Sequence, residues 1–516
     1  MSGTNKMNAP SILSGGVFAK KMGANLYIFD ISNTGDVSQT LVTTEGGVQR
    51  SLQDRFGDVV NVKDFGAKGD GQTDDFSAVN IAVSVAKNNG KALYFPAGTY
   101  ALGSSLIITD FDNLTIFGDS KSLSIIHSLN PSHVFRVIRC NYVNIYNLGF
   151  THANDNSTSG NTLQIEDCNF CSFRGIEIID ARNDAICPVS TNFTEFRTES
   201  PLSRYIEIKD CVINGTRGGA GIRVLRSSDI KVVNNTIQNC TDEAICVDFG
   251  AYNAIISGNT FTLNGGAGQI SLDGASGTIV SSNRLMSLNG EGVPCIVSNG
   301  NLETSYGCVI TGNSCYGGAK GIWLKGFSDV TEPILEPPYA NGYYGSNRCI
   351  VIGNAIRNTP IGIQLEGRSK DNVIYCNTYT NCTRAIKDLS TEVDNWILPE
   401  RIGIANIGSL VYPSNNSEHL TVPASSATVT ATNDGIAEFF YNSSGNKSGW
   451  RGIMNTSSGE ADRDFKFAAA DASSFYRVAV RKGDSIKVEY PSDTSGHALV
   501  IRVIGAKKMY ASIRAD

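Results

Sequence analysis

Asparagine recurs at regular intervals along the middle of this chain of 516 residues, each time just before a short apolar run. The positions are Asn235, Asn259, Asn283, Asn313, Asn354 and Asn377, with spacings of 24, 24, 30, 41 and 23 residues. A repeat of about two dozen residues is the sequence signature of a solenoid, and the longer spacings indicate insertions. Stacked asparagine side chains can hydrogen-bond from coil to coil, and asparagine tolerates left-handed turns. We therefore expect these residues to form a structural ladder rather than a ligand site.

A second repeated pattern follows the asparagines. Six segments, GIRVL, AICVD, QISLD, PCIVS, GIWLK and GIQLE, align without gaps. Side chains on a strand alternate between its two faces, which assigns each aligned column to the inside or the outside. The inward columns are expected to contain Ile222, Ile245, Ile270, Cys295, Ile322 and Ile363, then Val224, Val247, Leu272, Val297, Leu324 and Leu365. The outward column is expected to contain Leu225, Asp248, Asp273, Ser298, Lys325 and Glu366.

The segment Asn61–Tyr100 indicates how the solenoid begins. It reads as a short strand, a Gly-rich turn, a helix and a second strand. Asp74 or Asp75 is expected to cap the helix N-terminus, and Asn89-Gly90 to end it. Its apolar stripe is expected to be Ala78, Ile81, Ala82, Val85 and Ala86. A helix of this kind covers the open end of a solenoid, where uncovered strand edges would promote aggregation.

The segments VNVKDFGAKGDGQTDD and LYFPAGTY resemble the N-terminal motif of the pectate-lyase-like parallel β-helix superfamily. The resemblance implies an all-β fold, a right-handed parallel β-helix. The short segment before the motif resembles bacteriophage tailspikes, which include capsule and O-antigen depolymerases.

Three regions are expected along the chain. Residues 1–55 form a short N-terminal segment that we expect to anchor the protein to a virion, and residues 56–396 form the β-helix. Residues 397–516 contain the strand-like segments Thr421–Ala431, Gly435–Asn442, Tyr476–Tyr490 and His497–Gly505, which predict a small β-sandwich-like domain. In tailspike-like proteins such a domain supports trimerisation or contacts carbohydrate, and the sequence does not choose between these roles.

The composition of the chain argues against several classes of function. A net charge of -6 argues against a nucleic-acid partner, and no apolar run is long enough to span a membrane. The N-terminus has no signal-peptide layout, so we expect synthesis in a host cytoplasm. The 13 cysteines all lie between Cys140 and Cys382, an odd number that predicts buried reduced thiols rather than disulfides. No cofactor and no metal are expected.

The outward column brings two carboxylates together. Asp248 and Asp273 are 25 residues apart and are expected to lie at equivalent places in adjacent coils. At a strand spacing of roughly 4.8 Å and an effective dielectric near 20, two such charges repel by roughly 3 kcal/mol. A shared proton or a cation would relieve the repulsion, and a shared proton is what glycoside hydrolysis uses. The alternative is a solvated pair whose side chains point apart, and a calcium site with Asp242 is a further possibility.

Asp242 and Glu243 lie in the turn before the same strand. The segment CTDEAICVDFG resembles the strand start of polygalacturonase-like β-helix hydrolases, in which paired carboxylates activate water and protonate the leaving oxygen. ARNDAICP is a second copy that aligns Asp184 with Glu243. The Gly-His-Gly and Arg-x-Lys elements of that family are absent, so the resemblance implies paired-carboxylate chemistry without implying pectin as the substrate. The alternative is that Asp242 only closes a turn.

Substrate-binding side chains are expected on the same wall and in two insertions. Trp323 is either a sugar platform or a subunit contact, and Arg223 and Lys325 either hold an anionic sugar or are solvated. The insertion Trp323–Arg348 contains Tyr343 and Tyr344. The second insertion, Cys187–Tyr205, also carries aromatic and acidic residues.

The sequence therefore predicts a homotrimeric phage tailspike that attaches to other tail proteins through its N-terminal segment and cleaves bacterial capsule or O-antigen. The preferred activity is an endo-acting hydrolase that uses Asp248 and Asp273, with Asp242 and Glu243 as competitors. Catalytic carboxyl groups roughly 6.5–9.5 Å apart would invert the anomeric centre, and groups near 5 Å would retain it. The alternatives are a lyase that acts by β-elimination on a uronate-containing glycan, a non-catalytic glycan-binding adhesin and a purely structural spike.

Overall fold

The computed structural model describes residues 57–191, 203–287, 292–299, 304–326, 345–390 and 395–397, and the bounds of the strands towards the two ends of the chain. Tyr343, Tyr344 and the aromatic and acidic residues of both insertions lie outside the described residues.

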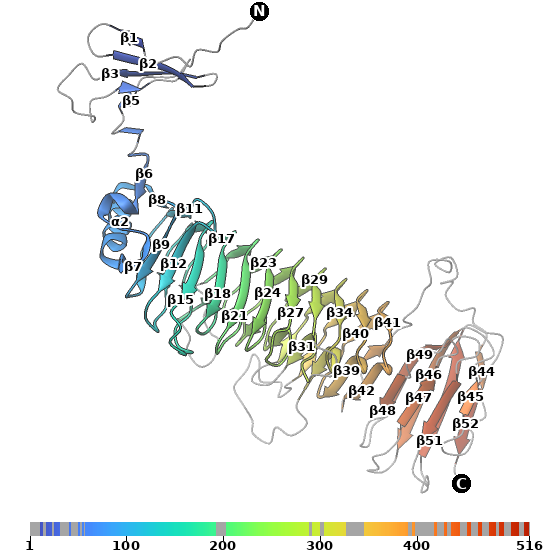
Figure 1. The fold of residues 1–516 in the computed structure, drawn as a ribbon. Helices are drawn as coiled ribbons and strands as arrows, with labels where there is room; N and C mark the ends of the chain where they lie inside the picture. The colour runs from blue at the N-terminus through green and yellow to red at the C-terminus, as the bar shows by residue number, and fades with distance from the viewer. Residues whose placement is uncertain are drawn as a thin grey trace, which may run out of the picture.

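The described coils form three long parallel sheets that run side by side along the molecule (Figure 1). The first ladder, which carries the candidate site, contains β10 (Leu106–Thr109), β13 (Phe135–Ile138), β16 (Leu163–Glu166), β19 (Ile186–Val189), β22 (Ile222–Leu225), β25 (Ile245–Asp248), β28 (Ile270–Asp273), β31 (Ile296–Asn299), β35 (Lys320–Lys325), β39 (Ile361–Gly367) and β42 (Arg384–Ser390). Each strand pairs in parallel with the strand one coil away, which is the architecture expected from the repeat.

The other two ladders complete each coil. The second ladder contains β6 (Val59–Asn61), β8 (Ala92–Phe95), β11 (Thr115–Gly118), β14 (Asn144–Tyr146), β17 (Ser172–Arg174), β20 (Glu207–Lys209), β23 (Lys231–Val233), β26 (Ile255–Ser257), β29 (Ile279–Ser281), β33 (Val309–Thr311), β37 (Ile350–Ile352), β40 (Val373–Tyr375) and β43 (Trp396–Ile397). The third contains β7 (Asp70–Asp74), β9 (Gly98–Leu102), β12 (Ser124–Ser128), β15 (Gly149–His152), β18 (Glu177–Ala181), β21 (Val212–Thr216), β24 (Thr236–Cys240), β27 (Thr260–Thr262), β30 (Arg284–Met286), β34 (Ser314–Tyr316), β38 (Ala355–Arg357) and β41 (Thr378–Thr380). A short pair, β32 (Ser305–Tyr306) with β36 (Ser346–Asn347), lies between coils.

The asparagine ladder is confirmed. The side chain of Asn259 shows the pattern: its Oδ1 accepts from the backbone N–H of Asn235 at 2.8 Å, and its Nδ2 donates to Val232 O at 2.9 Å and to Asn283 Oδ1 at 3.0 Å. The same links continue through Asn313 and Asn354. The ladder residues are almost fully buried, so each amide satisfies backbone groups that water cannot reach.

The predicted inward columns are buried, but the register of one strand was predicted wrongly. Ile270 pairs with Ile296, not with Cys295, and Asp273 pairs with Asn299, not with Ser298. The neighbouring coil agrees, because Ile296 pairs in turn with Ile322. The slip is one residue. The reason is that Ile296 takes the inward position, and this places the Ser298 hydroxyl inside the coil, where it bonds to Ser346 Oγ at 2.9 Å.

Helix α2 (Phe76–Asn89) packs against the 3-10 turn η2 (Val62–Phe65) and strands β6 and β8, and so covers the N-terminal end of the coils (Figure 1). Gly90 ends the helix in the left-handed conformation, as expected. Asp74 accepts from Phe76 N at 3.0 Å, whereas the buried Asp75 accepts from Lys68 N and Gly69 N and holds the preceding turn.

The predicted apolar stripe of α2 was partly wrong. The buried residues are Val79, Ala82, Val83 and Ala86, and Ile81 is 50% exposed. The helix carries apolar residues on two adjacent stripes, and only one of them faces the coils.

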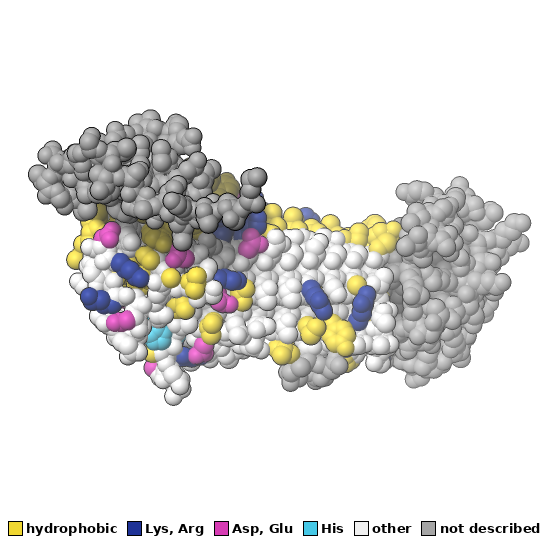
Figure 2. All heavy atoms as spheres, turned by 45° about the horizontal axis from the view of Figure 1, so that its top comes forward, with side chains coloured by type: hydrophobic (Ala, Val, Ile, Leu, Met, Phe, Trp, Pro, Cys, Tyr) yellow, Lys and Arg dark blue, Asp and Glu magenta, His cyan; other side chains and the backbone are white. Residues whose placement is uncertain are grey.

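All 13 cysteines are free thiols, of which 11 are buried, as the sequence predicted. Among the described residues, no helix is long and apolar enough to cross a membrane. On the face drawn in Figure 2, most charged side chains lie over the N-terminal coils, and the face further along carries few charges.

Short antiparallel strands lie at both ends of the chain. Near the N-terminus, β1 (Ser11–Leu13), β2 (Val17–Met22), β3 (Asn25–Asp30), β4 (Leu41–Val42) and β5 (Arg50–Ser51) form one sheet. Towards the C-terminus lie β44 (Ser417–His419), β45 (Thr428–Thr430), β46 (Gly435–Ser443), β47 (Arg451–Asn455), β48 (Arg463–Lys466), β49 (Ser474–Val480), β50 (Ser485–Glu489), β51 (His497–Ile504) and β52 (Tyr510–Arg514). Strands β45, β46, β49, β50 and β51 lie within or overlap the segments expected from the sequence. The three domain boundaries and the roles of the end regions stay predictions.

Candidate active site

Arg223 lies at the centre of a group of carboxylates on the outer face of the first ladder. Its Nε is 3.0 Å from Asp184 Oδ1, and its Nη2 is 2.6 Å from Asp242 Oδ2. Nη2 also lies 4.0 Å from Glu243 Oε2, and Nη1 lies 3.7 Å from Asp248 Oδ2. We call these five residues the Arg223 cluster. One guanidinium thus faces four acids.

Three successive coils supply the Arg223 cluster. Asp184 comes just before β19, Arg223 lies in β22, and the remaining three acids come from β25 and the turn that precedes it. The residue of the middle coil that aligns with Asp184 and Glu243 is Ala220, so no third acid lies between these two. The long Arg223 side chain can therefore bridge acids that lie two coils apart.

Two glycines give the carboxylates room. A Cβ at Gly219 would lie 2.6 Å from Asp184 Oδ1, and a Cβ at Gly266 would lie 2.6 Å from Asp242 Oδ1. Real Cβ atoms do not approach oxygens so closely, and Gly266 also has a φ of +67°. Only glycine at these positions allows the acids to lie against the backbone of the neighbouring coil.

Each buried acid keeps one backbone hydrogen bond. Asp184 Oδ1 accepts from Ala220 N at 2.8 Å, and Glu243 Oε1 accepts from Ala267 N at 2.9 Å. Asp248 Oδ1 accepts from the next residue's N–H at 2.8 Å. Glu243 Oε2, in contrast, is buried and has no hydrogen-bond partner among the described residues.

The surroundings shift the pKa values of Glu243, Asp248 and Arg223 away from their ordinary values. Burial, followed by the nearby Asp242 carboxylate, raises the pKa of Glu243 to about 7. Burial also raises the pKa of Asp248, although Phe249 N and Arg223 oppose the change. Burial alone would lower the pKa of Arg223, but the surrounding acids, Asp184 first, raise it. The Glu243 carboxyl group is therefore partly protonated near neutral pH, and three further acids lie around the same guanidinium.

Asp248 and Asp273 lie opposite each other in adjacent strands, as the sequence predicted. Asn299 Nδ2 approaches Asp273 Oδ2 at 3.5 Å. Arg223 lies 2.6 Å from Asp242 Oδ2 and 3.7 Å from Asp248 Oδ2, so a side chain of the protein supplies positive charge beside these two acids. The calcium site stays a prediction.

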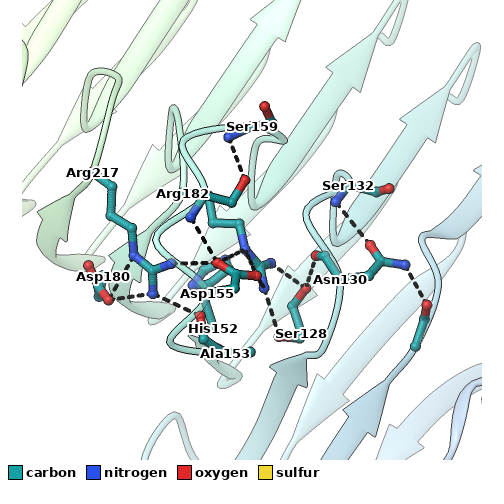
Figure 3. Close-up of polar contacts among 12 residues, drawn as sticks. Ser128, Asn130, Ser132, His152, Ala153, Asp155, Ser159, Asp180, Arg182 and Arg217 are labelled. Carbon is teal, nitrogen blue, oxygen red and sulfur yellow. Dashed lines mark hydrogen bonds and ion pairs between the residues drawn. The ribbon is translucent and has the colours of Figure 1, made fainter.

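A buried ion-pair network supports the segment that carries Asp184. Arg182 is fully buried and donates to Asp155 Oδ2 at 2.6 Å and to Ser128 Oγ at 2.8 Å. Arg217 joins Asp155 to Asp180, and Figure 3 shows both arginines converging on Asp155.

The loop that contains Asp155 is also tied down at its far end. Asn161 Oδ1 accepts from Asp184 N at 3.1 Å and from Asn183 Nδ2 at 3.0 Å. Residues 182–184 are therefore held from both ends of the loop 153–162, and Asp184 is positioned against Arg223 as a consequence.

Trp323 lies on the same outer face, four strands beyond Arg223 in the same register column. Its Nε1 donates to Glu366 Oε2 at 3.0 Å. Lys320 Nζ lies 3.8 Å from the centre of the ring, and Lys325 Nζ lies 5.1 Å from it. Trp323 is therefore associated with two ammonium groups rather than presenting an uncovered ring.

The sequence found most of these residues but not their arrangement. It placed Asp242, Glu243 and Asp248 near one another and named Asp184 through the repeated ARNDAICP segment. It treated Arg223 as a sugar ligand or a solvated side chain, whereas Arg223 is only 20% exposed and contacts acids. The small residues before β22 are the signal that could have revealed this bridge.

Residues 59–271 match the family described as rhamnogalacturonase A/epimerase, pectate lyase-like. This stretch lies within the parallel coils, so that part of the chain is similar to pectate-lyase-like parallel β-helix proteins.

Three curated relatives resemble short parts of the chain. A probable glucan endo-1,3-beta-glucosidase of Arthroderma benhamiae is 40% identical over 76 residues, which is 13% of this chain and 8% of that protein. The tail spike protein of an Escherichia phage is 44% identical over 59 residues, 11% of this chain and 7% of that protein. Depolymerase 1, capsule K30/K69-specific, of Klebsiella phage K5-2 is 38% identical over 71 residues, 14% of this chain and 9% of that protein. The chain thus matches less than a tenth of the length of each relative.

Proposed function

We propose that this protein is a phage tailspike that binds a bacterial surface polysaccharide, capsule or O-antigen, and cleaves it within the chain as a glycoside hydrolase. The observation that carries the proposal is the Arg223 cluster, in which Glu243 has a pKa raised to about 7 beside the carboxylate of Asp242. Glycoside hydrolysis needs a carboxylic acid and a carboxylate in one site. The tail spike and depolymerase relatives support the polysaccharide substrate and the virion setting.

We assign proton donation to the pair Asp242 and Glu243. Both side chains approach the same nitrogen of Arg223, and burial together with the neighbouring Asp242 raises the pKa of Glu243 to about 7. Asp242 is the more accessible member, with a side chain that is 32% exposed. In the absence of substrate the proton lies on buried Glu243. During cleavage this proton moves through Asp242 to the leaving oxygen, and Glu243 becomes a carboxylate.

We assign water activation to the pair Asp248 and Asp273. Asp273 is partly exposed and lies one coil beyond the Arg223 cluster. Asp248 lies nearest to Nη1 of Arg223, whereas Glu243 lies nearest to Nη2. The two pairs of acids therefore lie on different sides of the guanidinium. A water molecule bound between the pairs and the sugar would give inversion of the anomeric centre.

Arg223 also favours a hydrolase over a lyase. A lyase needs a cation that neutralises the carboxylate of a uronate beside the bond that breaks. Arg223 already faces four acids of the protein, so it is poorly available to an incoming carboxylate. In the proposed hydrolase its role is to position the acids.

The test uses purified capsular and O-antigen polysaccharides of Escherichia and Klebsiella, incubated with the full chain. Fragment size, new reducing ends and ultraviolet absorbance of new double bonds are followed together. Shorter fragments with reducing ends and no new absorbance are expected. New absorbance would replace the hydrolase with a lyase, and binding without shortening would reduce the protein to an adhesin.

Variants of the acids test the site itself. Glu243→Gln, Asp242→Asn, Asp248→Asn and Asp273→Asn are each expected to reduce the rate by about a hundredfold or more. Asp210→Asn is the matched control, because Asp210 is exposed and its left-handed backbone accepts asparagine. Full activity in all four variants would exclude this site.

The wider proposal includes a homotrimer and attachment through residues 1–55 to other tail proteins. The outer face of the second ladder carries an apolar column, Ile255, Ile279, Val309, Ile350 and Val373, which supports contact with a second copy. Sedimentation of the wild type and of Ile279→Lys/Ile350→Lys tests it. A trimer that the double variant reduces to monomers is expected, and a monomeric wild type would exclude the homotrimer.

A further inference from the structure

From the side chains around Trp323 we infer a subsite for an anionic sugar of the polysaccharide, separate from the Arg223 cluster. The inference rests on the proposed function and adds the charge class of the substrate. The residues concerned are Lys320, Trp323, Lys325 and Lys387, all partly exposed on strands β35 and β42.

Trp323 brings two ammonium groups together. Lys320 Nζ at 3.8 Å and Lys325 Nζ at 5.1 Å both lie within the range in which a cation is attracted to an indole ring. The ring is held by its own hydrogen bond to Glu366, and Gln364 Nε2 donates to the same carboxylate oxygen at 2.8 Å. The indole is thus fixed by one acid and organises the lysines.

A third lysine adds to the same patch. Lys387 aligns with Gln364, which aligns in turn with Trp323. The pKa of Lys320 is lowered by burial first, and the positive charges of Lys387 and Lys325 lower it further against the opposing effect of Glu366. Three lysines and one glutamate leave an excess of positive charge that a bound anion would relieve.

The position of the patch relates it to the Arg223 cluster. Trp323 is four strand spacings from Arg223 on the same sheet face, roughly 19 Å. A single oligosaccharide is long enough to span this distance. Cys246, Ser271 and Val297, which lie between the two places in this column, are buried, so the sugar chain would have to pass beside the column. Its acidic group would lie at the lysines, away from the negatively charged acids that would repel it at the point of cleavage.

The chemistry fits a carboxylate better than a neutral sugar. Lysine ammonium groups donate to carboxylate or phosphate oxygens in charge-assisted hydrogen bonds, which are stronger than neutral ones. The indole ring, with one ammonium already at 3.8 Å from its centre, is less suited to stacking against a neutral sugar. The structure therefore favours an acidic polysaccharide.

The test measures binding of three uronate-containing polysaccharides, as oligomers and in carboxyl-reduced neutral form: the polyuronates alginate and polygalacturonate, and hyaluronan, in which the uronate alternates with a neutral sugar. Calorimetry with the full chain of Glu243→Gln avoids cleavage during the titration. At least one native polyuronate is expected to bind, and its carboxyl-reduced form to bind roughly tenfold more weakly or worse. Equal affinity for both forms, or no binding to any of the three, would overturn the inference.

Variants locate the site. Lys320→Gln/Lys387→Gln is expected to lose about tenfold in affinity for the native oligomer and to weaken its salt dependence. Lys231→Gln, an exposed lysine on the second ladder, is the matched control and should bind as the parent does. A double variant that binds normally would contradict the assignment. So would tight binding of free glucuronate, which indicates a simple anion site, or a changed oligomeric state, which indicates a subunit contact.

Failure of this inference can be told from failure of the proposed function. Cleavage of neutral polysaccharides alone leaves the hydrolase in place and excludes the anionic subsite. Binding of polyuronate at the lysines without cleavage of any polysaccharide leaves the subsite in place and excludes the hydrolase.

Discussion

The raised pKa of Glu243 has a consequence for stability that does not depend on any substrate. The carboxyl group titrates near pH 7 in the folded protein and at about 4.5 when the chain is unfolded. Between these values the folded state binds more protons than the unfolded state, so stability falls as the pH rises from about 4.5 to about 7 and is constant above. The difference of two to three pH units corresponds to about 3 kcal/mol.

Glu243→Gln removes this titration with little change of shape. The Gln Oε1 can still accept from Ala267 N, and the amide nitrogen takes the place of the protonated Oε2. The variant is therefore expected to be about as stable as the wild type near pH 5 and about 3 kcal/mol more stable near pH 8.5. A shift in melting temperature equals the change in stability divided by the entropy of unfolding, which grows with chain length. For a chain as long as the described coils, about 3 kcal/mol corresponds to a rise of roughly 4 °C.

Scanning calorimetry at one fixed scan rate measures the effect, because a chain of this size can unfold irreversibly. The quantity of interest is the difference in melting temperature between variant and wild type at the two pH values. Asp210→Asn is the control for loss of one surface charge and should show no such dependence. A difference that does not change with pH, or a variant that is less stable at high pH, would refute the account of Glu243.

Three further predictions concern the scaffold. Asn259→Ala removes the partner of Asn235 N and of Val232 O inside the coils, and we expect a loss of about 3 kcal/mol or more, seen as a lower melting temperature and faster amide exchange in both neighbouring coils. Asp75→Ala is expected to destabilise the protein more than Asp74→Ala, which should cost about 1 kcal/mol. Each carboxylate accepts from two backbone N–H groups, but only Asp75 is buried, so only its loss leaves donors that water cannot reach; equal losses in thermal unfolding would contradict this. Asp155→Asn leaves Arg182 buried without its charge partner and should cost about 3 kcal/mol or more, with a further loss of polysaccharide cleavage that Asp180→Asn, at the exposed end of the same network, does not show.

Local sequence patterns predicted the coils well because each coil repeats the same alternation. The asparagine positions, the pairing of Asp248 with Asp273 and the end of α2 at Gly90 all follow from residue type and spacing. Periodicity could not decide which residues are buried where two faces of one element carry equally apolar residues. Ile81 and Val79 lie on adjacent apolar stripes of one helix, and only the shape of the solenoid end decides which stripe is buried.

The Arg223 cluster could not be predicted from spacing for a different reason. Arg223 lies on an outward position like Lys325, and the sequence does not say in which direction a long side chain will extend. Its direction depends on the acids of the coils before and after it, and on the absence of side chains at Gly219 and Gly266. These are contacts between coils, which alternation within one strand does not record.

The free thiols restrict the redox conditions under which this chain can fold. Eleven of them are buried, out of reach of oxidants in the solvent while the protein stays folded. A chain that unfolds in an oxidising medium exposes all of them at once and can cross-link in many wrong ways before the coils re-form. We therefore expect the solenoid to fold under reducing conditions. In an oxidising medium its lifetime then depends on the rate of unfolding rather than on the equilibrium between folded and unfolded chains.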